Sequence, residues 1–291
     1  MSFALRPMCG ARVERNDAMR LPSRRDILLG GAVTVASQLM PVVAMSAAGD
    51  DLDAPSADYD SLLSRYVVNG RDGIARVRYA AWVKSERDLE RLDAFIAAQS
   101  RLRPSALDQA AAFAYWANLY NALTLRVVLK SYPVRSIKHI KSTGTGFDLK
   151  AFSGPWRTKL VEIEGVPKSL DEIEHGTMRP TFRDPRVHYA VNCASIGCPN
   201  LHARAWRAPT LDADLDAAAR AYVNHPRGAS VGRNRSLRVS SLYKWYREDF
   251  GSGDAGVIRH LRRYASEPLA AQLEGVTRVA GNSYDWSLND A

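Results

Sequence analysis

The chain has 291 residues, of which 46% are hydrophobic and 24% are charged, with 19 glycines and 14 prolines. This is ordinary globular usage, and it excludes collagen-like, coiled-coil and wholly disordered chains. The formal net charge of +9 would suit an anionic partner. However, no cluster of Lys and Arg interleaved with aromatic residues is present in the sequence, so we expect no nucleic-acid binding.

Residues 1–48 are typical of a twin-arginine signal peptide. A Ser-Arg-Arg-Asp motif begins at Ser23, the stretch 27–48 is uncharged, and small residues at its end offer a signal-peptidase site near Ala48. An uncleaved membrane anchor is the alternative, although Leu and Ile are sparse there. We expect the twin-arginine export machinery as a partner, a periplasmic or secreted location, and no stable membrane span after cleavage.

The rest of the chain is predicted to hold a flexible, acidic leader over 49–58 and one α+β domain over 59–289. Ser85 with Asp88 forms a capping box that begins an amphipathic helix. The stretch 108–132 is apolar nearly all round, which predicts a central buried helix. A small, mostly antiparallel sheet completes the expected fold.

Periodicity predicts the smaller elements of this domain. A second capping box at Ser169 and Glu172 begins a short helix. The stretch 186–192 alternates polar and apolar residues like a strand. Further elements are two hairpins, 159–168 and 229–239, and helices over 211–222, 242–250 and 257–264.

Two carboxamides, Asn118 and Asn121, lie one turn apart inside the apolar helix. Burying an unpaired carboxamide costs about 1–3 kcal/mol, so both side chains need partners. They either fasten loops to the core, or one of them orients a catalytic imidazole or lines a site.

Cys193 and Cys198 are the two cysteines that remain after cleavage. In an oxidising compartment they form either a disulfide or a protected functional site. Cys193 follows the predicted strand, and 193–199 leaves it through a turn or a short helix. The N-terminus of such a helix would lower the pKa of the Cys193 thiol and offer backbone N–H groups to an oxyanion. A thiol nucleophile also needs a base, and His175, beside Glu174, and His188 flank this loop.

Zinc is a further alternative for this loop. The spacing of His188, Cys193, Cys198 and His202 is looser than that of paired zinc ligands, so we expect no metal and no cofactor.

Four blocks of the sequence, 115–124, 169–176, 184–199 and 284–289, together resemble the family catalogued as domain of unknown function 547. The resemblance implies a domain and a site, without an established reaction. The family blocks map onto Asn118, Asn121, Glu174, His175, Arg186, His188, Cys193, Ser195, Cys198 and Pro199. Of these, we assign Asn121, Arg186 and Ser195 to substrate binding.

We interpret the chain as a thiol-dependent amide hydrolase or acyl transferase, by analogy with papain-like and transglutaminase-like enzymes. Cys193 would attack a carbonyl carbon, and His175 or His188 would accept the thiol proton. Asn118, Asn121 or Glu174 would orient that imidazole. The alternative is a non-catalytic periplasmic binding or assembly domain with a Cys193–Cys198 disulfide. A thiol–disulfide exchanger is less favoured, because the spacing is not Cys-x-x-Cys.

Overall fold

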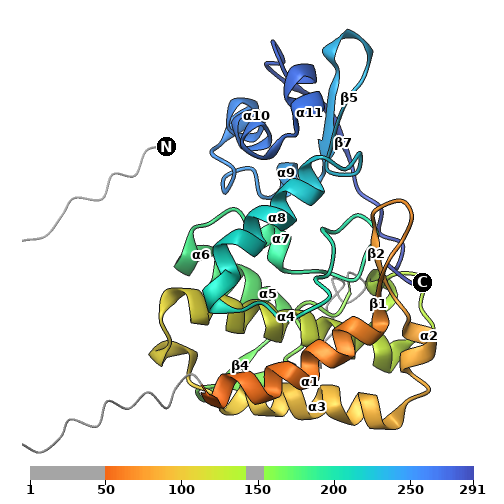
Figure 1. The fold of residues 1–291 in the computed structure, drawn as a ribbon, viewed down its shortest axis with the longest axis vertical. Helices are drawn as coiled ribbons and strands as arrows, with labels where there is room; N and C mark the ends of the chain where they lie inside the picture. The colour runs from red at the N-terminus through yellow and green to blue at the C-terminus, as the bar shows by residue number, and fades with distance from the viewer. Residues whose placement is uncertain (1–49, 142–153) are drawn as a thin grey trace, which may run out of the picture. The chain divides into compact units, whose positions relative to one another are not determined.

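The computed structural model describes residues 50–141 and 154–291, with side chains from Ser56 onward in the first range (Figure 1). The predicted signal peptide, 1–48, lies outside the described residues. Among the residues that are described, no helix is both long and apolar enough to cross a membrane.

Helices make up most of the described chain. The α-helices are α1 (Asp50–Tyr66), α2 (Tyr79–Trp82), α3 (Glu86–Arg101), α4 (Gln109–Ser131), α5 (Leu170–Ile173), α6 (Arg179–Phe182), α7 (Val187–Ala190), α8 (Leu211–Val223), α9 (Leu242–Trp245), α10 (Gly253–Tyr264) and α11 (Glu267–Gln272). Short 3-10 turns cover Pro104–Ala106, Ile137–His139, Ala208–Thr210 and Arg233–Arg235, and a π-helical turn covers Glu174–Met178.

The strands form three small sheets. They are β1 (Val67–Asn69), β2 (Ala75–Val77), β3 (Val161–Ile163), β4 (Val166–Lys168), β5 (Ala229–Val231), β6 (Leu237–Ser240) and β7 (Val279–Ser283). The pairs β1–β2, β3–β4 and β5–β6 are antiparallel, whereas β7 joins β6 in parallel. The expected α+β class, with small and mostly antiparallel sheets, is confirmed, and so are both predicted hairpins.

Helix α4 is the central helix that the apolar run predicted. Asp108 caps it by accepting a hydrogen bond from the backbone N–H of Ala111 at 2.9 Å, and the helix ends at Ser131, before Pro133. Every residue in 113–125 is buried. One half of α4 therefore packs in the core with α1 and α3, and the other half in the core with α5 and α7.

A third core lies among α8, α10, α11 and the sheet formed by β5, β6 and β7. Figure 1 shows α1 and α3 side by side on one side of α4, and α8 leading from that region toward the third core. The segment between α7 and α8, which carries both cysteines, packs in the first and second cores, and α8 runs from the second core to the third.

Three local predictions need correction. The stretch 186–192 is not a strand: α7 occupies Val187–Ala190, and all four of its residues are buried, so alternation could not distinguish a short buried helix from a strand. The predicted leader is helical from Asp50 onward. The predicted helix 242–250 ends at Trp245 and continues as turns.

Candidate functional site

The two asparagines of α4 hold the backbone on either side of the cysteine loop. Asn121 donates a hydrogen bond to the carbonyl of Ala190 at 2.9 Å and accepts one from the N–H of Asn192 at 2.8 Å. Asn118 donates to the carbonyl of Trp206 at 2.9 Å and accepts from its N–H at 2.8 Å. Both carboxamides therefore act as loop fasteners, and neither contacts an imidazole through these bonds.

No helix begins after Cys193: of the two alternatives, a turn or a short helix, the chain forms the turn, so the predicted helix N-terminus is absent from this described segment. The N–H of Ala194 donates to the side chain of Asn192, and the N–H groups of Ile196 and Gly197 donate to the carbonyls of Ser287 and Asp285. These backbone donors are engaged within the fold. The expected backbone oxyanion hole is therefore not formed. The cause is the turn at Ala194, whose φ is +59°.

The C-terminal tail pairs with the cysteine loop. Ser195 bridges to Leu288, and Gly197 approaches Asp285 so closely that a Cβ on Gly197 would lie 2.8 Å from the Asp285 backbone. This close approach places Tyr284 beside the cysteines.

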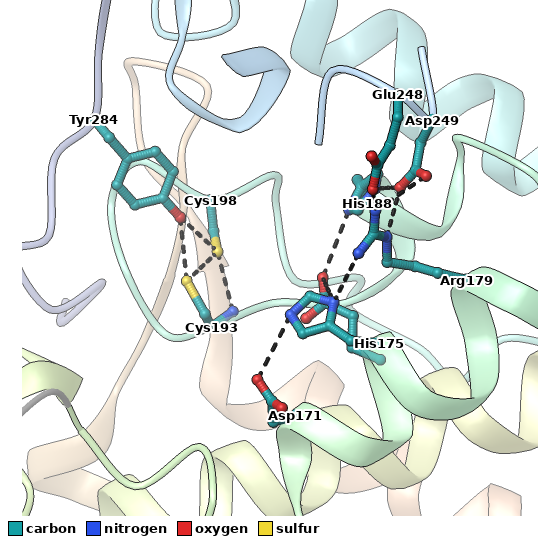
Figure 2. A network of polar contacts seen from close by, with 10 residues as sticks. Asp171, His175, Arg179, His188, Cys193, Cys198, Glu248, Asp249 and Tyr284 are labelled. Atoms are coloured by element: carbon teal, nitrogen blue, oxygen red, sulfur yellow. Dashed lines mark hydrogen bonds and ion pairs between the residues drawn. The ribbon is translucent and has the colours of Figure 1, made fainter. Parts of the chain in front are cut away.

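The thiol cluster consists of Cys193, Ser195, Cys198 and Tyr284. Figure 2 shows the two cysteines beside Tyr284. Both cysteines are free, with their sulfur atoms 2.7 Å apart. The Tyr284 hydroxyl lies 3.1 Å from each sulfur and accepts a hydrogen bond from the Ser195 hydroxyl at 3.0 Å. The backbone N–H of Cys193 donates to Cys198 Sγ at 3.0 Å. Cys198 is 5% exposed, whereas Cys193 is half-buried.

These contacts separate the acidities of the two thiols. Burial raises the pKa of Cys198, but hydrogen bonds from Cys193 and Tyr284 outweigh burial and lower this pKa to about 7. The hydrogen bond to Cys198, together with burial, raises the pKa of Cys193 well above its usual range. The two thiols titrate as a coupled pair, which loses its first proton near neutral pH, with Cys198 as the favoured site of the charge.

His188 is the centre of a second polar group. Its Nε2 lies 2.7 Å from Asp249 Oδ2, its Nδ1 lies 3.6 Å from Glu174 Oε1, and its ring stacks on Tyr246 with centroids 4.2 Å apart. Burial lowers the pKa of His188, but the bonds to Asp249 and Glu174 outweigh it, so this pKa is raised. Burial raises the pKa values of Glu174 and Asp249, but the bonds from His188 outweigh it and lower both. His188 is thus a buried cation between two carboxylates.

His175 lies at the edge of this group, on the π-helical turn. Arg179 binds Asp249 with two nitrogens, at 2.6 and 3.1 Å, and its Nη1 lies 3.4 Å from His175 Nδ1. The other nitrogen of His175 lies 3.9 Å from Asp171 (Figure 2). π-Helical turns are rare and often mark functional sites.

Among the described residues, the thiol cluster and the histidine group are not joined by a hydrogen bond. The partners of both sulfurs are hydroxyl, thiol and backbone groups, and neither His175 nor His188 is among them. Two tyrosines lie near both groups: burial raises the pKa values of Tyr120 and Tyr246, and charge on Glu174 and on the cysteine pair raises them further. The two groups are therefore electrostatic neighbours, and the predicted Cys–His pair is not formed.

The remaining predicted residues have structural partners. Arg186 pairs with Asp184, Asp212 and Asp216 at 2.7–2.8 Å, which occupies its guanidinium. Ser195 belongs to the thiol cluster. His202, which belonged to the zinc alternative, stacks on Trp206. No group of three or more potential ligands is placed to hold a metal ion within the described part of the chain.

Sequence reasoning did not assign a role to Tyr284, Asp249, Tyr246 or Arg179. Tyr284 had a signal, since it opens the fourth family block, 284–289. Asp249 and Tyr246 had none, because they lie in a stretch that was predicted as an ordinary helix.

Residues 104–223 match the model of a family described as "Protein of unknown function, DUF547". This match contains three of the four sequence blocks and supports the resemblance for that segment; the fourth block lies beyond it. No curated protein and no solved structure matches the chain.

Proposed function

We propose that Cys193 and Cys198 form a redox-active dithiol and that the protein exchanges disulfides with its substrates. The observation that carries this proposal is the 2.7 Å contact between two free thiols that differ in acidity and exposure. The half-buried Cys193 is the sulfur that a substrate would reach, and the buried Cys198 is the resolving thiolate. Exchange needs a thiolate, and the lowered pKa of Cys198 supplies one near neutral pH, a single proton transfer away from Cys193.

The exchange requires no separate base. The proton of Cys193 passes to Cys198, and the Cys193 thiolate attacks one sulfur of a substrate disulfide. A new S–S bond forms, and the other substrate sulfur leaves as a thiolate, which takes the proton from Cys198. The Cys198 thiolate then attacks Cys193 and releases the second substrate thiolate. Two electrons pass to the substrate, the pair becomes a disulfide, and a substrate dithiol reverses the sequence.

The second candidate is the thiol-dependent acyl transfer or amide hydrolysis that the sequence suggested. The hydroxyls of Ser195 and Tyr284 favour it, because they lie 3.2 and 3.1 Å from Cys193 Sγ. By rotating away from their present acceptors, Tyr284 and Cys198, they could donate hydrogen bonds to an oxyanion in place of the backbone groups. Cys198 would then accept the proton that was assigned to His175 or His188. Asn118 and Glu174 would support the surrounding fold.

Location is part of the proposal. Export through the twin-arginine pathway, as the N-terminal motif suggests, would let the protein fold around the dithiol before it reaches an oxidising compartment. There the pair would be oxidised by exchange with protein or small-molecule disulfides.

The test is equilibration of the full-length chain in glutathione buffers of graded redox potential, followed by acid quenching, alkylation and peptide-level mass spectrometry. This readout separates Cys193 and Cys198 from Cys9. We expect both site thiols to disappear in one two-electron step. We also expect Cys198→Ser to trap glutathione on Cys193, and Cys193→Ser to trap little on the buried Cys198.

Other outcomes identify the alternatives. A pair that stays oxidised in every buffer until the protein is denatured would indicate a structural disulfide, and with it the binding or assembly domain. Turnover of an activated ester that is lost in Cys193→Ser, without reversible pairing of the thiols, would favour acyl transfer.

A further inference from the structure

Tyr284 belongs to a group of aromatic side chains that extends from the thiol cluster to the surface. We name Tyr284, Trp245, Trp286 and Trp156 the aromatic patch. The ring centroid of Tyr284 lies 4.9 Å from that of Trp245 and 4.7 Å from that of Trp286. Trp286 also lies 5.6 Å from Trp245 and 5.8 Å from Trp156. The rings are therefore in continuous contact.

The patch is open to solvent at Trp245. This side chain is 46% exposed, and only Val166, at 51%, is a more exposed large apolar residue in the part of the chain that is described. The ammonium group of Lys138 lies 5.1 Å from the ring of Trp286, and of the four residues of the patch only Trp245 is exposed. Exposed tryptophans are uncommon outside binding surfaces, and aromatic anchors supply much of the energy of recognition.

The patch is continuous with the reactive sulfurs. The hydroxyl of Tyr284 lies 3.1 Å from both sulfur atoms, and its ring contacts Trp245. A ligand side chain on Trp245 would therefore belong to a residue about two or three positions from a cysteine bound at Cys193, given a rise of about 3.3 Å per residue in an extended peptide.

We propose that the aromatic patch is the substrate subsite of the dithiol, and that it selects polypeptides with an aromatic residue two or three positions from the exchanging cysteine. This inference rests on the proposed function. Small disulfides such as oxidised glutathione carry no aromatic group and would use the thiols alone. The patch thus sets a preference for polypeptides over small disulfides.

The test compares two disulfide-linked peptides that differ only by Phe or Ala two residues from the cysteine, with oxidised glutathione as the small substrate. For Trp245→Ala in the full-length chain, we expect KM for the Phe peptide to rise about tenfold, the effect of losing one aromatic contact. The change for the Ala peptide and for glutathione should be much smaller, so that the preference for the Phe peptide over the Ala peptide falls about tenfold. Trp245→Phe should restore most of the affinity. Val166→Ala is the matched control, because it removes an equally exposed apolar side chain from the β3–β4 hairpin.

A binding measurement separates the two proposals. A peptide with Ser in place of Cys cannot exchange, and we expect its Phe form to bind wild-type protein more tightly than its Ala form in isothermal titration calorimetry. If that preference holds and disappears in Trp245→Ala while no disulfide is exchanged, the subsite stands and the proposed function fails. The subsite is refuted if exchange proceeds but Trp245→Ala has the wild-type KM for both peptides. It is also refuted if Trp245→Ala slows exchange with the two peptides and with glutathione by the same factor.

Discussion

Replacing Asp249 by Asn should destabilise the protein strongly, because it removes one of the two carboxylates that are paired with the buried His188 cation. Asp249 accepts hydrogen bonds from His188 at 2.7 Å and from Arg179 at 2.6 Å, and its side chain is 22% exposed, against 1% for His188. Removing one partner of a buried ion pair costs about 3–5 kcal/mol. Since Asp249 keeps some contact with solvent, we expect a loss of about 3 kcal/mol.

The neighbouring residue provides the control. Glu248 also binds Arg179, at 2.9 Å, but its side chain is 77% exposed. Glu248→Gln should therefore cost less than about 1 kcal/mol. Both variants are measured by urea unfolding of the full-length chain at pH 6, where His188 is charged. Equal losses for Asp249→Asn and Glu248→Gln would refute the reasoning.

The same network predicts how stability depends on pH. The raised pKa of His188 means that its contribution is complete below its unfolded pKa of about 6.5 and is lost as pH rises through the folded value. The lowered pKa values of Glu174 and Asp249 mean that their contributions are present above about pH 4 and are lost as pH falls through the folded values. Wild type should therefore lose stability above pH 6.5 more steeply than Asp249→Asn. Parallel curves would contradict this.

Three further variants test the thiol cluster and its supports. Tyr284→Phe removes a hydrogen bond from the thiolate, so the pKa of the pair, seen in the pH profile of alkylation rate, should rise above about 7; an unchanged profile would exclude this role. Asn121→Ala leaves the buried N–H of Asn192 unpaired, while the carbonyl of Ala190 keeps its bond from Trp206 Nε1, and should lower the free energy of unfolding by about 1–3 kcal/mol in urea; a loss below about 1 kcal/mol would show that water replaces the carboxamide. Gly197→Ala places a Cβ 2.8 Å from the Asp285 backbone and should lower the Tm, whereas Gly176→Ala, with no neighbour closer than 3.8 Å, should be tolerated; equal Tm values would contradict the close packing of the tail.

Much of the fold follows from local sequence signals. The capping side chains of Ser85 and Ser169, and the apolar run of α4, depend on neighbours within a few residues, and the structure has each of these elements. The need of Asn118 and Asn121 for partners was also predictable, because buried amides must be satisfied. Their partners, the backbone near Ala190 and at Trp206, were not predictable, since they lie about 70 to 90 residues away.

The candidate site shows the same division. Cys193 and Cys198 were predictable as a reactive or bonded pair from their residue type and spacing. His188 was predicted to lie on a strand and to accept the thiol proton. It lies instead on a short helix, hydrogen-bonded to Asp249 and ion-paired with Glu174. Four consecutive buried residues carry no periodicity that separates helix from strand, and no local signal reveals which charge a histidine meets.

The division of acidity within the pair follows from how the chain closes around it. The tail brings the Tyr284 hydroxyl within 3.1 Å of both sulfurs, but only Cys198 also accepts the backbone N–H of Cys193. The lowered pKa of Cys198 and the raised pKa of Cys193 both follow from these bonds. In the proposed exchange, Cys193 becomes a thiolate only after its proton has moved to Cys198. Tyr284 is also part of the aromatic patch. A peptide that binds Trp245 would therefore lie against the residue whose hydroxyl helps to lower the pKa of Cys198.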